Sequence, residues 1–237
     1  MFINIGGRRI AAEFAGIGTP TVVFDAFGGA GTDAWAPLWS AVTAFTHACR
    51  YDRAGTGQSD PFPEPVSGRQ LVADLHTVLA QTQTAPPFLL VGASFGGAIM
   101  QLFARTHPAL TAGLILLDSM HWDQVPRFYQ SDPRHGAALE EEIATHLAAV
   151  DWPSTAQQLR NAPPLPTIPL RVISRGRQTV VGAVWADLQR DLVQQSARGQ
   201  QIIAEQSGHG IVFDQPELVV EVIRALVFDL RDTSTTV

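Results

Sequence analysis

Short apolar runs alternate with stretches of helical spacing along most of this chain. Four consecutive apolar residues at 88–91, preceded by two prolines, predict a buried strand. Ile99, Leu102 and Phe103 then recur at helical spacing after a group of glycines, which predicts a helix. The pattern therefore predicts a strand, a sharp turn and a helix, with Ser94 at the turn.

The same alternation continues on both sides of this unit. It predicts a hairpin of strands at 2–5 and 8–14, further strands at 21–25, 47–51, 113–117, 170–174 and 201–204, and helices at 70–83, 183–197 and 216–230. Strands that alternate with helices favour a mostly parallel sheet with helices on both faces. The predicted fold class is therefore α/β.

Residues 120–165 interrupt this rhythm. They combine several prolines with scattered aromatic residues, and they contain one predicted helix near 136–150. A long segment of this kind inside a compact domain is typical of a functional insertion. We therefore expect a lid after the sixth strand, a core made of residues 1–119 and 166–231, and a flexible tail at 232–237.

Composition limits the class of protein. A chain of 237 residues that is 46% hydrophobic and 16% charged fits one globular domain with a sizeable core. The net charge of −6 and the absence of a basic cluster argue against nucleic acid as a partner. Every basic residue is arginine, which excludes a Schiff base, a serine-lysine dyad and a P-loop. Cys49, the single cysteine, is expected to be an inert core residue.

The start of the chain and its apolar runs bear on location. Charged residues follow the first apolar residues, which is not the order of a signal peptide, and no uncharged apolar run reaches membrane-spanning length. We therefore expect a cytoplasmic protein without a membrane partner, either monomeric or a homodimer.

The turn at Ser94 carries the main chemical signal. Gly92-Ala93-Ser94-Phe95-Gly96 matches the pattern G-x-S-x-G, in which a serine is raised on a strained turn between a strand and a helix. The two glycines remove side chains that would collide as the chain reverses. A neutral serine is a poor nucleophile, so this chemistry also needs a histidine and a carboxylate that orients it.

Two residues after later strands are candidates for these roles. His209 lies just beyond the last predicted strand, at the sheet edge where catalytic groups of parallel sheets gather, and we predict that it is the base. Asp118 directly follows the strand at 113–117, and we predict that it is the acid. No acidic residue lies at 174–178, after the next strand. The alternatives for the acid are Asp187, Asp191 and Glu205.

The remaining histidines and the early glycine-rich loop have simpler interpretations. His47, His76 and His107 suit structural roles, and the histidines of the insertion (121, 135 and 146) lack metal-site spacing. The loop at 26–32 follows a strand but lacks the G-x-G-x-x-G spacing of a nucleotide site. We therefore expect no metal, and we expect this loop to supply backbone N–H groups to an oxyanion.

Three motifs together resemble the α/β-hydrolase superfamily over nearly the whole chain outside the insertion. They are the early glycine-rich loop, the segment Asp52-Arg53-Ala54-Gly55-Thr56-Gly57-Gln58-Ser59, and the G-x-S-x-G turn with a late histidine. The resemblance implies the α/β-hydrolase fold and an oxyanion hole made by the N–H groups of Phe95 and of Phe27 or Gly28. It implies no cofactor.

The sequence departs from the superfamily at two points. Ala26-Phe27 stands where many members have His-Gly, and most members carry the acid after the penultimate strand. Some members carry it one strand earlier, which favours Asp118. The serine nucleophile disfavours epoxide hydrolases and haloalkane dehalogenases, whose relatives use aspartate there.

The resemblance implies acyl chemistry on a small-molecule substrate. Aromatic residues suggest an apolar pocket and therefore an apolar carboxylic ester or lactone. The residues expected to line it are Trp35, Trp122, Phe128, Tyr129 and Trp152, with Trp39 and Phe95 as further candidates. The alternatives are a carbon-carbon bond hydrolase, an acyltransferase, and a non-catalytic ligand-binding member of the fold.

Overall fold

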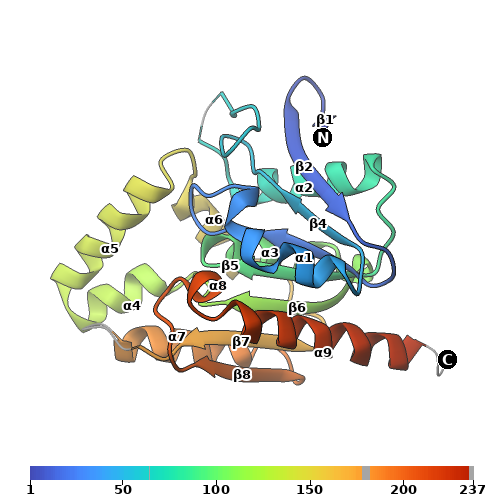
Figure 1. Cartoon of the computed structure of the whole chain (residues 1–237). Helices are drawn as coiled ribbons and strands as arrows, with labels where there is room; N and C mark the ends of the chain where they lie inside the picture. The colour runs from blue at the N-terminus through green and yellow to red at the C-terminus, as the bar shows by residue number, and fades with distance from the viewer. Residues whose placement is uncertain (64, 178–181, 235–237) are drawn as a thin grey trace.

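A single eight-stranded sheet forms the centre of the molecule in the computed structural model, which describes residues 1–63, 65–177 and 182–234 (Figure 1). The strand order is β1-β2-β4-β3-β5-β6-β7-β8. The strands are β1 (Phe2–Asn4), β2 (Arg9–Ala15), β3 (Thr21–Asp25), β4 (Ala48–Tyr51), β5 (Phe88–Ala93), β6 (Thr111–Leu117), β7 (Leu170–Arg175) and β8 (Gly199–Ala204). The first two strands run antiparallel to their neighbours, and β3 to β8 are parallel. The predicted fold class is confirmed.

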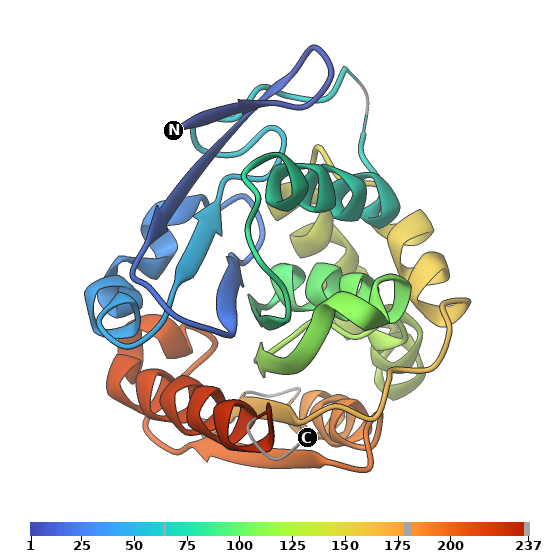
Figure 2. The ribbon, with the colours of Figure 1, turned by 90° about the vertical axis from the view of Figure 1, so that its right-hand side faces the viewer.

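Helices cover both faces of the sheet. They are α1 (Ala36–Thr43), α2 (Gly68–Gln81), α3 (Phe95–Thr106), α7 (Gly182–Val193), α8 (Ile211–Asp214) and α9 (Pro216–Ser234). The helices α1 and α9 pack together on one face, and α2 and α3 pack together on the other (Figure 2). Side chains of β5 alternate between the two cores: Leu90 faces α2 and α3, whereas Leu89 and Val91 face α1 and α9.

Sequence patterns predicted most of these elements to within a few residues, but not α1 or α8. The helix expected at 70–83 runs from Gly68 to Gln81, because Ser67 and Gln70 form a capping box that starts it earlier. The helix expected to end at 230 continues to Ser234, so residues 232–234 are helical rather than part of a flexible tail. Residues 235–237 lie outside the described residues. Cys49 is fully buried as expected, and burial raises the pKa of its thiol.

Three helices lie between β6 and β7, where the sequence predicted one. They are α4 (Gln124–Ser131), α5 (Pro133–His146) and α6 (Trp152–Arg160). The short helices α4 and α6 begin beside Asp123 and Asp151 in a proline-rich stretch, which hides their periodicity. The helix α5 projects beside the body of the molecule with most of its residues exposed (Figure 1). That this insertion forms a lid stays a prediction.

No helix in the described ranges combines the length and the apolar character needed to cross a bilayer.

Candidate active site

Ser94 lies at the sharp turn between β5 and α3. Its φ is 50°, a left-handed conformation that a non-glycine residue adopts only when its surroundings hold it there. A Cβ atom at Gly92 would lie 2.6 Å from the carbonyl oxygen of Gly96. A Cβ atom at Gly96 would collide with the backbone carbonyls of Asp25 and Ala26. Both glycines are therefore needed to bring α3 against the end of β3.

The structure brings Asp118 and His209 together from different strands. Asp118 follows β6 and His209 lies in the loop after β8, yet the distance between Asp118 Oδ2 and His209 Nδ1 is 2.7 Å. The carboxylate of Asp118 is fully buried, whereas 45% of the His209 side chain is exposed. Asp118 also has a positive φ, of 42°. An Nδ1–H donated to Asp118 leaves His209 Nε2 as a proton acceptor.

Two further side chains hold the carboxylate of Asp118. The indole Nε1–H of Trp185, on α7, donates a hydrogen bond of 2.7 Å to Oδ1. Arg175, at the end of β7, places its Nε 2.6 Å from Oδ2, and its backbone N–H donates to Oδ1 at 3.3 Å. Because both oxygens are held, the buried carboxylate has one fixed orientation toward His209. The sequence analysis missed Arg175 and Trp185, which lie 57 and 67 residues from Asp118.

The other candidate acids lie elsewhere. Asp187 forms an ion pair with Arg190, and Asp191 forms one with Arg127, both at partly exposed positions. Glu205 is exposed. Of the four candidates, Asp118 is the one that the structure places at His209.

The loop that carries His209 is held by Asp214 of α8. The carboxylate of Asp214 accepts hydrogen bonds from Gly208 N at 2.9 Å and from Ser207 Oγ at 3.0 Å, and these bonds lower its pKa. Gln215 fixes the same loop through its Oε1, which accepts from Gln206 N at 2.9 Å. The imidazole is therefore carried by an ordered loop rather than by the strand itself.

A cavity of about 910 Å³ lies in front of these residues, and both Ser94 and His209 line it. Its walls are largely apolar. The helix α5 contributes Leu139, Ile143 and, just past its end, Leu147, spaced four residues apart on one face. His146 and Arg175 are among the polar residues that also border the cavity. Such a cavity suits a small molecule of mainly apolar character.

Arg53 holds the loop after β3, residues 26–30, in place. Its guanidinium donates to the carbonyl oxygens of Ala26 at 2.6 Å, Phe27 at 2.9 Å and Gly28 at 3.1 Å, and it forms a buried ion pair with Asp25. Burial raises the pKa of Asp25, although Arg53 and Tyr51 both favour its charged form. Because these carbonyls point at Arg53, the loop has one fixed course beside Ser94.

The backbone N–H groups of this loop divide into two sets. Gly29 N donates to the carbonyl oxygen of His146 at 3.2 Å, and Ala30 N donates back within the loop. In the described part of the chain, the N–H groups of Phe27 and Gly28 donate to no protein acceptor, and both residues line the cavity. Phe95 also lines the cavity, and its N–H belongs to the first turn of α3, where helix geometry leaves donors unpaired.

Most of the aromatic residues predicted to line the pocket do not reach it. Phe128 and Phe95 line the cavity as expected. The other predicted rings are not among the residues that line it, and they pack into the protein or onto its surface. Trp35 packs on Phe24, Trp122 stacks on His121, Tyr129 bonds Glu140 at the surface, Trp152 packs behind Phe95, and Trp39 lies by Arg50.

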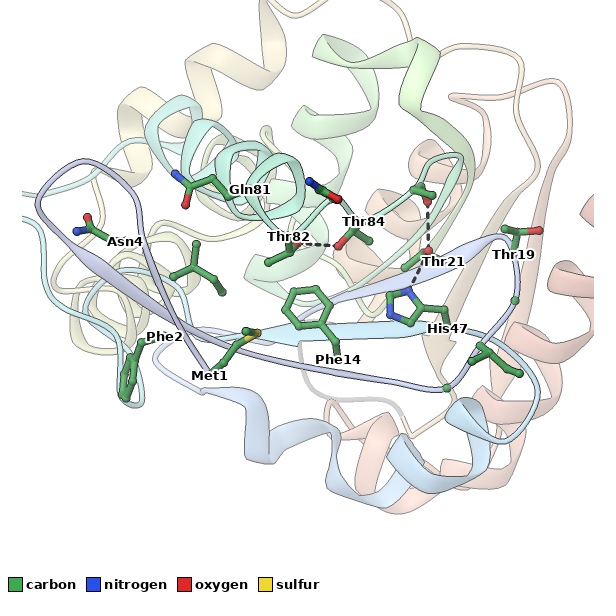
Figure 3. Close-up of a pocket in the computed structure, with 16 residues that line it drawn as sticks. Met1, Phe2, Asn4, Phe14, Thr19, Thr21, His47, Gln81, Thr82 and Thr84 are labelled. Carbon is green, nitrogen blue, oxygen red and sulfur yellow. Dashed lines mark hydrogen bonds between the residues drawn. The ribbon is translucent and has the colours of Figure 1, made fainter.

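A second cavity, of about 770 Å³, lies at the opposite edge of the sheet, where β3 and β4 begin (Figure 3). It contains a hydroxyl-imidazole contact of 3.2 Å between Thr21 Oγ1 and His47 Nδ1. The carbonyl oxygen of Ala85 also lies 3.2 Å from the Thr21 hydroxyl, and no aspartate or glutamate is among the described residues that line this cavity to orient His47. The cavity that contains Ser94 is therefore the better candidate for catalysis.

The described residues include no group of three or more histidine, cysteine, aspartate or glutamate side chains arranged to hold a metal ion.

Comparison with known proteins gives one family match and several similar folds. Residues 22–222 match the model of the alpha/beta hydrolase family. The uncharacterized protein YqjL of Bacillus subtilis is 28% identical over 202 residues, which cover 84% of this chain and 80% of YqjL. A thermophilic esterase from Thermogutta terrifontis is 18% identical with a TM-score of 0.72, covering 97% of each chain. An enol-lactonase from Burkholderia xenovorans is also 18% identical with a TM-score of 0.72, covering 96% of this chain and 100% of the other.

Proposed function

This chain belongs to the alpha/beta hydrolase family, and from that premise we propose that it is a serine hydrolase that cleaves an apolar carboxylic ester or lactone. The observation that carries the proposal is the 2.7 Å contact between Asp118 and His209 in a cavity that Ser94 also lines. A serine that lines a cavity, an imidazole and a buried carboxylate are the three groups that this chemistry requires.

In the first half of the reaction, Ser94 Oγ attacks the carbonyl carbon of the substrate while His209 Nε2 accepts its proton. Asp118 holds the other ring nitrogen and stabilises the imidazolium that forms. The oxyanion accepts hydrogen bonds from the N–H of Phe95 and from that of Phe27 or Gly28, and each donor contributes roughly 3 kcal/mol to lowering the barrier. His209 then protonates the leaving alkoxide, which completes the acyl-enzyme.

In the second half, His209 removes a proton from a water molecule, which attacks the acyl carbon. Collapse of the second tetrahedral intermediate releases the carboxylic acid and returns the proton to Ser94. The apolar wall formed by α5, Phe128 and Trp185 favours an apolar acyl or alcohol group over a charged one. An esterase and an enol-lactonase among the similar folds act on bonds of this class, which adds support to the proposal.

The test is intact mass spectrometry after exposure to a fluorophosphonate, on the wild type and on Ser94→Ala. This reagent captures an activated serine, so we expect one adduct on the wild type and none on the variant. Hydrolysis of 4-nitrophenyl esters and simple lactones by the same two proteins completes the test. A folded wild-type protein that forms no adduct and turns over no ester would contradict the proposal and favour a ligand-binding protein.

A further inference from the structure

The segment that links β6 to the insertion contacts Ser94 as well as carrying Asp118. The backbone N–H of Ser94 donates to the carbonyl oxygen of Leu117 at 2.9 Å, and the N–H of Met120 donates to the carbonyl oxygen of Ser94 at 3.0 Å. Both backbone groups of Ser94 are therefore bonded to residues within two positions of Asp118. We call residues 117–120 the crosspiece, because this segment carries Asp118 and is hydrogen-bonded to the backbone of Ser94.

Two glutamines from different helices hold the crosspiece at Ser119. Gln189, on α7, donates from its Nε2 to the carbonyl oxygen of Ser119 at 2.8 Å. Gln101, on α3, donates from its Nε2 to Ser119 Oγ at 3.1 Å and to the carbonyl oxygen of Met120 at 3.4 Å. Gln101, Ser119 and Gln189 are each no more than 2% exposed. The crosspiece is thus hydrogen-bonded to α3 and to α7 in the interior of the protein.

Each of these two glutamines has a paired amide nitrogen and an amide oxygen that is paired with no described residue. Among the described residues, the Oε1 atoms of both Gln101 and Gln189 are buried without a hydrogen-bond partner. A buried unpaired polar atom costs roughly 1–3 kcal/mol, and this cost offsets part of the stability that the amide hydrogen bonds contribute. The N–H donation of each amide to Ser119 or Met120 is then the feature that distinguishes glutamine from methionine at these positions.

We propose that Gln101 and Gln189 are positioning residues that fix Ser94 relative to His209 through the crosspiece. The proposal rests on the serine hydrolase function proposed above. Without the two amide donors, the carbonyl of Ser119 loses its partner and the crosspiece gains freedom to shift. Such a shift moves Met120 away from Ser94 and changes the approach of the serine hydroxyl to His209. Neither glutamine is proposed to contact the substrate.

The experiment compares Gln189→Met and Gln101→Met with the control Gln195→Met. Gln195 follows α7, away from the crosspiece; it donates its Nε2 to the carbonyl oxygen of Asp191 at 3.2 Å and accepts from Arg105 at 3.0 Å. The three variants thus remove the same kind of side-chain donor. For each protein we would measure kcat and KM on 4-nitrophenyl butyrate, the rate of fluorophosphonate labelling, thermal stability, and hydrogen exchange at the amide of Met120.

We expect kcat to fall by roughly 10- to 100-fold in Gln189→Met and in Gln101→Met, because a small misplacement of reacting groups has effects of this size. KM should change less than about twofold, which marks loss of an interaction made in the transition state. Labelling should slow in parallel, and the Met120 amide should exchange faster. The control should keep the wild-type kcat and Met120 exchange even where its thermal stability falls.

Two results would overturn the proposal. In the first, a folded Gln189→Met or Gln101→Met keeps wild-type kcat and Met120 exchange, which gives the amide a purely structural role. If one of the two variants does not fold, the kcat and Met120 exchange of the other variant test the proposal. In the second, the wild-type protein itself forms no adduct and hydrolyses no ester, which contradicts the proposed function and removes the basis of this inference. The wild-type control separates these two failures.

Discussion

At the scale of single residues, the site is marked by backbone strain. Among the described residues, the non-glycine residues with positive φ are Gln83, Ser94 and Asp118, so two of the three belong to the candidate site. Conformations of this kind cost roughly 1–3 kcal/mol each and persist where the surrounding structure over-determines them. For Ser94 that structure is the crosspiece, and for Asp118 it includes Arg175 and Trp185.

Asp118→Asn tests the assignment of the acid. An asparagine retains the shape of the side chain, but its amide can hold the wrong tautomer of His209, so we expect kcat to fall about 10⁴-fold. The matched control is Asp187→Asn, at a partly exposed position paired with Arg190. Steady-state kinetics on one ester would check both. Equal losses in the two variants, or a larger loss in Asp187→Asn, would contradict the assignment.

The sequence was informative about Asp118 for a physical reason. A residue that directly follows a parallel strand lies at the carboxyl edge of the sheet, so its place is set by local structure. Arg175 and Trp185 reach the same carboxylate through tertiary packing, which no local pattern encodes. The aromatic residues show the same limit: the apolar character of Trp35 and Trp152 predicts burial, but it does not say which cavity or core receives the ring.

At the scale of elements, α5 is the part of the insertion that forms much of the cavity wall beside the candidate catalytic residues. One face of the helix lines the cavity, and the carbonyl oxygen of His146 at its end accepts from Gly29 N in the loop after β3. The spacing of Leu139, Ile143 and Leu147 was present in the sequence as an i, i+4, i+8 pattern. That pattern, rather than the aromatic residues, carried the information about the pocket wall.

Ile143→Ala tests the role of α5 in substrate recognition. Loss of apolar contact at roughly 0.8 kcal/mol per methylene should raise KM for 4-nitrophenyl hexanoate by about 10-fold, with little effect on the acetate. Ile143 is only partly buried, so the free energy of unfolding should change little. Glu141→Ala, on the exposed side of the same helix, is the control. A similar rise in KM for both esters would show that Ile143 acts through the shape of the helix instead.

At the scale of the whole molecule, buried histidines make stability depend on pH. His121 is 2% exposed, its Nδ1 accepts from Asp123 N at 3.0 Å, and burial lowers its pKa to about 4. Burial also lowers the pKa of His47 and of His107. Because an unfolded histidine has a pKa near 6.5, the folded state disfavours the protonated form.

We therefore predict that the free energy of unfolding decreases as the pH falls. The contribution of His121 is fully present above about pH 6.5 and is lost as the pH falls toward 4, by an amount on the order of 2–3 kcal/mol. Urea unfolding at pH 7 and pH 4.5 measures it, with His121→Asn as the comparison. We expect a weaker pH dependence in the variant; an unchanged dependence would assign the effect to other groups.

The overall architecture was predictable because buried strands and amphipathic helices alternate along the chain. Each strand-helix unit indicates the same fold class. The prediction of helices was poorest between β6 and β7. The helices of eight and nine residues there are stabilised by packing on the core rather than marked by sequence periodicity.

The position of His209 after the last strand also has a consequence for the protein while it is being made. The turn at Ser94 and the strand that precedes Asp118 are both synthesised in the first half of the chain, and Asp118 itself comes 91 residues before His209. A ribosome-bound chain that has released only this half holds the nucleophile without its base. Hydrolytic activity would therefore appear only when β8 has joined the edge of the sheet, so that turnover by a nascent chain would report that its folding is nearly complete.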